Sequence, residues 1–297
     1  MLHIYIRRTV LLLGALFGLR AATPLRAGDS PAAASAPDTR YGLFDLLDHR
    51  SSYGQGVFPE PFLVDESDAE DSELRLDWFH AKAGAARSDE GRVELEKGFG
   101  LLTIELEAQY ERNASPDVVE QGFGNVSIGA RYPLMEYVAP GGLFDTTFGV
   151  AAEVGIPTTS AISKNTEFVP KIFNDLRFGS HVTFQSICGY STLFGPGEES
   201  GLHTLEYGFV LGVTFQHKEL PLPGVRQFIP MFEIRGEKQL NHEDAHNSVL
   251  AFAGFRVNLK PIGDIQPRFG VGYVFPMNEV ARGDVHHGIY TSFVFEF

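Results

Sequence analysis

From Glu73 to Phe297 the chain repeats one pattern, in which apolar side chains alternate with polar or small ones and a cluster of turn formers follows. In residues 102–110, for example, Leu, Ile, Leu, Ala and Tyr alternate with Thr, Glu, Glu and Gln. Successive side chains of a strand point to opposite faces of the sheet, so each segment has one apolar face. Because no comparable stretch keeps a 3.6-residue period, the pattern predicts an all-β, antiparallel protein.

The length of these segments separates a soluble sheet from one that crosses a membrane. Strands of soluble proteins run about 5–6 residues, whereas a tilted strand needs about 9–11 residues to cross a bilayer. The segments here are of the longer kind, and their polar faces carry Glu, Arg and Gln, which do not suit the interior of a sandwich. A sheet edge cannot face lipid with unpaired N–H groups. We therefore predict a transmembrane β-barrel.

The number of segments gives a strand count. Twelve are expected, near 73–82, 91–99, 101–112, 121–134, 143–156, 164–174, 181–192, 203–216, 226–237, 247–259, 264–276 and 286–297. An even number is usual for bacterial barrels and puts both ends of this one on the periplasmic side. The sixth segment has the weakest pattern, because Pro170 cannot donate a ladder hydrogen bond. Ten strands, with a different assignment of the N-terminal region, is the alternative.

The residues before the barrel divide into two parts. Arg7 and Arg8 precede the apolar stretch Thr9–Leu19, and Ala27 ends a suitable cleavage site, so residues 1–27 are predicted to be a secretory signal peptide. Residues 28–72 form an acidic leader that we expect to be partly disordered. The leader acts as a tether, as a plug or as a periplasmic segment, and residues 73–297 form the barrel.

Charge and cysteine content exclude several functions. The chain has 24 Lys and Arg against 38 Asp and Glu, a net charge of −14. Removing residues 1–27, which hold four Arg and no acid, leaves −18. Nucleic-acid phosphates are therefore not an expected partner. Cys188 is the one cysteine, which excludes an intramolecular disulfide and a Cys-rich zinc site.

Several short phrases carry a family resemblance. Residues 122–132 read Gly-Phe-Gly-Asn-Val-Ser-Ile-Gly-Ala-Arg-Tyr, and residues 231–236, 253–256 and 269–276 follow in the expected order. Over roughly residues 90–297 the chain resembles the outer-membrane channel family labelled "MetA-pathway of phenol degradation". The resemblance implies a barrel of about twelve strands that moves small solutes, aromatic or hydrophobic ones among them, across the outer membrane of a Gram-negative-type bacterium.

The C-terminal residues indicate how such a barrel reaches its membrane. Phe293, Phe295 and Phe297 alternate with Val and Glu, and this ending resembles the recognition signal of outer-membrane barrels. The expected partners are therefore outer-membrane lipid and the barrel-assembly machinery, the latter through Phe297.

Alternation also predicts which charged residues line the lumen. Besides Glu94 and Glu96, they are Glu105, Glu107, Arg131, Glu153, Glu206, Glu233, Arg235, Arg256 and Arg268. Two interpretations are open, because buried charges persist only when paired or hydrated. Residues 233, 235, 256 and 268 form a network that braces the lumen, or the lining selects solutes by charge. About twelve strands predict a narrow or partly occluded pore.

One motif points to different chemistry. His242 to His246 fits H-E-x-x-H, which binds Zn²⁺ when both imidazoles share one face of a helix. Here the motif falls in a loop between two expected strands, so His242 and His246 are weak metal candidates. No enzyme activity and no cofactor are predicted. The expected function is a porin-like channel for passive transport of small solutes, and the alternative is a non-transporting structural or surface-binding outer-membrane barrel.

Overall fold

A computed structural model describes residues 58–65, 72–158, 161–241 and 247–297. All of these residues belong to one compact unit. The predicted signal peptide and the two weak metal candidates, His242 and His246, lie outside the described residues. Within those residues, no helix is long and apolar enough to cross a bilayer.

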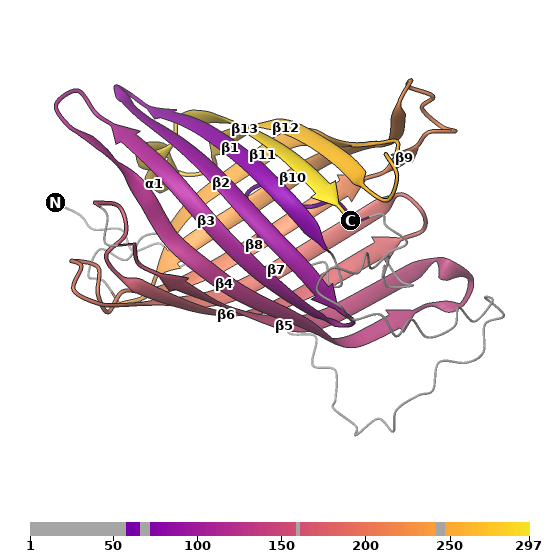
Figure 1. Ribbon diagram of the computed structural model, residues 1–297, viewed down its shortest axis with the longest axis horizontal. Coiled ribbons are helices and arrows are strands. Elements are labelled where there is room, and N and C mark those ends of the chain that lie inside the picture. The colour runs from indigo at the N-terminus through magenta and orange to yellow at the C-terminus, as the bar shows by residue number, and fades with distance from the viewer. Residues whose placement is uncertain (1–57, 66–71, 159–160, 242–246) are drawn as a thin grey trace, which may run out of the picture. The chain divides into compact units, whose positions relative to one another are not determined.

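Twelve long strands account for most of the described chain (Figure 1). They are β1 (Glu73–Ala83), β2 (Ala86–Phe99), β3 (Leu102–Ala114), β4 (Val119–Val138), β5 (Phe144–Ile156), β6 (Thr166–Phe178), β7 (Val182–Phe194), β8 (His203–Val213), β10 (Val225–Gln239), β11 (Asn247–Leu259), β12 (Gln266–Pro276) and β13 (His287–Glu296). A two-residue strand, β9 (Phe215–Gln216), follows β8 and pairs with β10. The short helices are η1 (Pro140–Gly142) and α1 (Glu279–Asp284).

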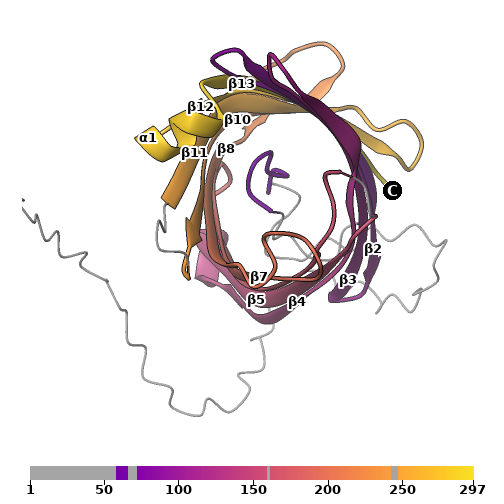
Figure 2. The ribbon, with the colours of Figure 1, turned by 90° about the vertical axis from the view of Figure 1, so that its left-hand side faces the viewer.

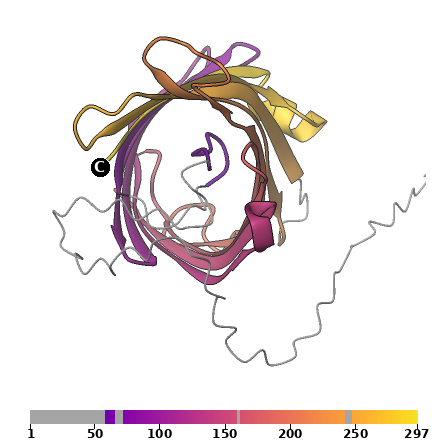
Figure 3. The same ribbon diagram turned by 90° about the vertical axis from the view of Figure 1, so that its right-hand side faces the viewer.

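The strands close into one antiparallel barrel. Each long strand pairs with its neighbours along the chain, β8 pairs with β10, and β13 pairs with β1. Figures 2 and 3 show the resulting ring from its two ends. The predicted twelve-strand barrel is confirmed, and the ten-strand alternative is set aside.

The doubtful sixth segment forms β6 in spite of its proline. Pro170 lies opposite Ala152 in the ladder with β5. In the ladder with β7, the pairing is interrupted between Phe168, which lies opposite Thr192, and Lys171, which lies opposite Gly189. The break falls at the residue that has no N–H to donate, which is how a sheet accommodates proline.

The two faces of the wall differ as the alternation predicts. Ile104 and Leu106 on β3 are 37% and 47% exposed, and Ile289 and Phe293 on β13 are 46% and 48% exposed. Large apolar side chains exposed in this way around a closed sheet form the surface that contacts hydrocarbon. The polar faces point inward, so the interior of this protein is charged.

The barrel has two ends, which we name by the chain that reaches them. The terminal rim holds the start of β1 at Glu73 and the end of β13 at Glu296, together with the turn that joins β2 to β3. The distal rim holds the turn at Gly84 and helix α1. Asn278 is the N-cap of α1, and its side chain accepts a hydrogen bond from the Ala281 amide at 3.0 Å.

Candidate functional site

A segment that precedes β1 lies inside the barrel. Residues 58–65, which we call the inner segment, lie within the ring of strands in both end views (Figures 2 and 3). Residues 58–64 are all buried although they belong to no helix or strand. A buried irregular segment must find partners for its backbone polar groups, and the barrel wall supplies them.

Glu233 on β10 binds the backbone of the inner segment. Its carboxylate accepts hydrogen bonds from the amides of Phe62 at 2.9 Å, Leu63 at 2.8 Å and Val64 at 3.3 Å. The Glu233 side chain is fully buried. A buried carboxyl group without partners is costly, and these three backbone donors supply its hydrogen bonds.

Three arginines of the wall bind the other side of the inner segment. Arg256 on β11 donates from Nε to the Glu60 carbonyl oxygen at 3.1 Å, and Arg75 on β1 donates to the Pro61 carbonyl oxygen at 2.5 Å. The guanidinium of Arg268 on β12 forms an ion pair with the Glu60 carboxylate. Since all three arginines are buried, the inner segment provides their compensating acceptors.

Apolar packing accompanies these polar contacts. The Phe62 ring stacks on Phe252 with centroids 4.2 Å apart and meets Tyr290 edge-on at 5.6 Å. The wall carries glycine where the inner segment comes closest. A Cβ atom at Gly208 would overlap the Val64 side chain, and one at Gly270 would overlap the Phe62 ring. Such glycines permit the close approach.

The last residue of the inner segment joins a bridge to β5 and β6. Lys171 Nζ lies 2.6 Å from a carboxylate oxygen of Asp65 and 2.6 Å from one of Glu153. Burial alone would raise the pKa of the Asp65 carboxyl, but the nearby Lys171 and Arg235 charges hold that pKa well below its usual range. Asp65 is therefore ionised at neutral pH.

Between the inner segment and the distal rim the lumen holds a cavity of about 1300 Å³, which we call the vestibule. Val64 and Asp65 contribute to one end of it, while Glu198 and Glu199 of the β7–β8 loop and Asp284 of α1 contribute to the other. Among the described residues, its lining has fourteen carboxylate side chains, six basic ones and no aromatic one. The vestibule is hydrophilic and strongly acidic.

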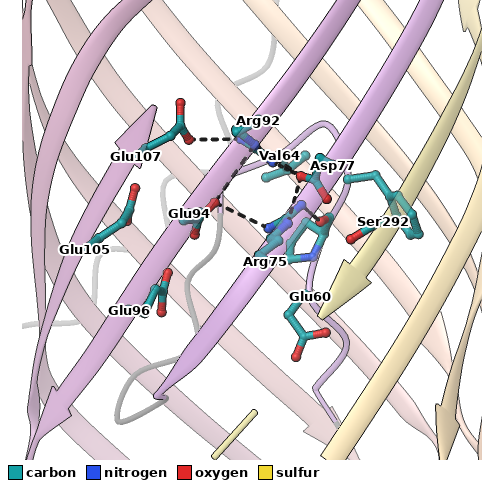
Figure 4. A network of polar contacts seen from close by, with 12 residues as sticks. Glu60, Val64, Arg75, Asp77, Arg92, Glu94, Glu96, Glu105, Glu107 and Ser292 are labelled. Atoms are coloured by element: carbon teal, nitrogen blue, oxygen red, sulfur yellow. Dashed lines mark hydrogen bonds and ion pairs between the residues drawn. The ribbon is translucent and has the colours of Figure 1, made fainter. Parts of the chain in front are cut away.

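A charged network lies where the vestibule meets the inner segment (Figure 4). Arg92 on β2 contacts the carboxylates of Asp77 at 2.5 Å and Glu107 at 3.3 Å, and Arg75 contacts Asp77 at 2.8 Å. The Tyr290 hydroxyl donates to Asp77 at 2.9 Å. The network links β1, β2, β3 and β13, and it gives each arginine a fixed carboxylate.

The predicted lumen residues divide between two places. Those that line the vestibule are Glu94, Glu105, Glu107, Arg131, Glu153, Glu206 and Arg235. Those that contact the inner segment are Glu233, Arg256 and Arg268. The geometry brings Arg131 to Glu96 and Glu105, and Arg235 to Glu237. Whether any of them selects solutes remains a prediction.

Sequence reasoning missed several residues of this site. Arg92 occupies the same alternating positions as Glu94 and Glu96, and Arg75 and Asp77 alternate in the same way on β1, so the pattern contained the signal for all three. The contacts of the inner segment had no such signal, because residues 58–65 follow no period.

Two groups of carboxylates lie close enough to share a cation. Oxygens of Glu73, Glu94 and Glu96 lie within 4.8 Å of one another, and so do oxygens of Glu94, Glu105 and Glu107. Carboxylate oxygens are ligands for hard cations such as Ca²⁺ and Mg²⁺. Both groups also have arginine neighbours: Arg131 contacts Glu96 and Glu105, while Glu94 lies 3.9 Å from Arg92.

Comparison with known proteins gives the fold. No family model matches the sequence, and no curated protein matches it. Among solved structures, the COG4313 outer membrane channel from Pseudomonas putida F1 matches with a TM-score of 0.52 and 12% identity, over 79% of this chain and 100% of that one. The NanC porin matches at 0.44 and 11%, over 75% and 98%, and the KdgM porin at 0.38 and 13%, over 75% and 98%. The first likeness shows that this chain has the fold of an outer-membrane β-barrel.

Proposed function

We propose that this protein is an outer-membrane channel for the passive movement of small solutes, and that the inner segment closes it. The observation that carries the proposal is the vestibule of about 1300 Å³, a polar cavity inside a wall whose outside is apolar. A polar cavity that ends at a segment outside the strand ladder is expected of a channel that can be closed, whereas a non-transporting structural or surface-binding barrel has no need of it.

The proposal assigns the remaining parts of the chain. Residues 1–27 direct export and are cleaved, and residues 28–72 are the leader, of which the inner segment is the closing element. Phe297 is recognised by the barrel-assembly machinery, the terminal rim faces the periplasm and the distal rim faces the outside. The chain then belongs with the phenol-degradation channel family that residues 122–132 resemble, and it acts without enzyme activity or a cofactor.

Opening requires the inner segment to leave its contacts. The segment is held by the Glu233 carboxylate and by three arginines, and no strand pairing ties it to the wall within the described residues. Polar contacts of this kind exchange with water when the segment moves, so a docked and an undocked state are both accessible. Solutes pass in the undocked state.

A reversible cross-link tests this directly. An ideal Cβ at Gly208 lies 3.1 Å from Cβ of Val64, and a disulfide needs about 3.5–4.5 Å, which a small shift provides. We expect the full chain carrying Val64→Cys and Gly208→Cys, with Cys188→Ser, to conduct little when oxidised. After reduction, single-channel recording in planar bilayers should show a higher conductance.

The matched control carries Val64→Cys and Cys188→Ser with Gly208 unchanged, because a Cβ at Gly208 would overlap an intact Val64 side chain. Its conductance should not respond to reductant. Equal conductance of the double-cysteine variant in both redox states would exclude the inner segment as the closing element. Lack of conductance in the wild-type chain and in both variants would exclude the channel itself.

A further inference from the structure

Five of the six basic side chains in the described lining of the vestibule already have carboxylate partners, and Lys164 is the sixth. Arg92 is shared by Asp77 and Glu107, Lys171 by Asp65 and Glu153, each at 3.3 Å or less. Likewise, Arg75 lies 2.8 Å from Asp77 and Arg235 lies 2.6 Å from Glu237. Arg131 forms an ion pair with Glu96. These five bases are therefore compensated by wall or segment carboxylates and present little free positive charge to a solute.

Several carboxylates of the vestibule have no such compensation. Within the described part of the chain, no basic side chain lies within ion-pair distance of Glu90, Glu111 or Glu206, all of which line the cavity. Glu111 receives hydrogen bonds from the neutral amides of Gln109 and Asn113, at 3.0 and 3.4 Å. In the described lining, the acids without an ion-pair partner therefore outnumber Lys164.

The register of the strands adds a second, independent observation. Glu90 on β2 lies directly opposite Glu111 on β3, and among the described residues neither has a basic side chain within ion-pair distance. Glu206 on β8 lies directly opposite Glu237 on β10, and only Glu237 of that pair is bound by Arg235. Like charges at directly opposite positions destabilise a sheet. Sequences retain such destabilising pairs mainly at functional sites. A cation bound between the two carboxylates would remove their repulsion.

We propose that the vestibule selects small hydrophilic cations, such as organic ammonium compounds, and that the carboxylates of Glu90, Glu111 and Glu206 carry this selectivity. The inference rests on the proposed channel function and names its solute class. A low-dielectric wall lined by one sign of charge concentrates the opposite sign and repels its own. Because the described lining has no aromatic side chain, it offers little to the aromatic or hydrophobic solutes that the family resemblance implies.

The test combines conduction with binding in the full chain. In a KCl gradient across a planar bilayer, we expect the reversal potential to report preference for K⁺ over Cl⁻ on the order of tenfold. Calorimetry of the detergent-solubilised protein should detect binding of spermidine, a triamine, but not of citrate. The triple variant Glu90→Gln, Glu111→Gln, Glu206→Gln should lose most of the K⁺ preference and bind spermidine about tenfold more weakly.

A matched triple variant controls for total charge. Asp117→Asn, Asp264→Asn and Glu279→Gln remove three exposed acids that do not line the vestibule, and should leave both measurements unchanged. Conductance without K⁺ preference would overturn the proposed selectivity but not the channel function. The same holds if spermidine binds the Glu90→Gln, Glu111→Gln, Glu206→Gln variant as tightly as it binds the wild type. Spermidine binding without conductance would support the selectivity and overturn the channel. Absence of both would overturn both.

Discussion

The two halves of the lumen use charge in opposite ways. Toward the terminal rim, buried charged side chains have partners. Glu233 accepts hydrogen bonds from three amides of the inner segment, Arg268 forms an ion pair with Glu60, and Arg177 forms one with Asp145. Toward the distal rim, carboxylates outnumber bases around an open cavity of about 1300 Å³. Matched charges hold a structure together, whereas unmatched charges beside water remain available to a solute. One barrel wall thus carries both a closing element and an acidic vestibule.

The largest effect should come from removing the acceptor that holds the inner segment. Glu233→Ala leaves the amides of Phe62, Leu63 and Val64 without their acceptor, at about 1–3 kcal/mol for each buried donor. A loss of about 3 kcal/mol shifts the docked-to-undocked ratio by more than about a hundredfold. Single-channel recording should then find the channel mostly open.

Glu237→Ala is the matched control for this prediction. Glu237 lies further along the same strand, is 46% exposed and belongs to the distal half. Its removal should leave the closed fraction unchanged. If the Glu233→Ala channel has the same closed fraction as the wild type, contacts in the terminal half of the lumen do not hold the inner segment in place.

A smaller effect should follow from filling the space that Phe62 occupies. Gly270→Val places methyl groups where the Phe62 ring lies, and overpacking of this kind costs about 1–3 kcal/mol. We expect the amides of residues 62–64 to exchange with deuterium about tenfold faster, as measured by mass spectrometry. Gly91→Val is the control, because nothing lies within 4 Å of a Cβ at Gly91. Unchanged protection in the Gly270 variant would argue against close packing at this point.

The smallest effect concerns the Asp65–Lys171 contact and its dependence on pH. The pKa of Asp65 lies below its ordinary 3.8 in the docked state, so its contribution to docking is complete above that value and is lost as the pH falls further. The difference in closed fraction between wild type and Asp65→Asn should therefore be equal at pH 7 and pH 5. It should shrink below about pH 4. A difference that already disappears at pH 5 would show that Lys171 does not lower this pKa.

Sequence periodicity predicts the strands of the barrel wall far better than it predicts the inner segment and the cavity inside the barrel. The alternation in residues 102–110 gives the faces of β3 directly, because a strand has one fixed period whatever it packs against. The same reasoning puts Glu206 and Glu233 on the inner face. Alternation cannot distinguish Glu206, which borders the cavity, from Glu233, which binds backbone amides, because that difference depends on where residues 58–65 lie. An irregular segment takes its conformation from long-range contacts, which leave no local pattern.

The short connection between the inner segment and β1 has a mechanical consequence. Only six residues separate Asp65 from Ser72, next to the first strand residue, so their Cα atoms remain within about 25 Å of each other in any conformation. An expelled segment therefore stays beside the mouth that it left, at an effective concentration in the millimolar range. Resealing is an intramolecular event that needs no second molecule, and a free peptide of the same sequence would compete with it only at comparable concentrations.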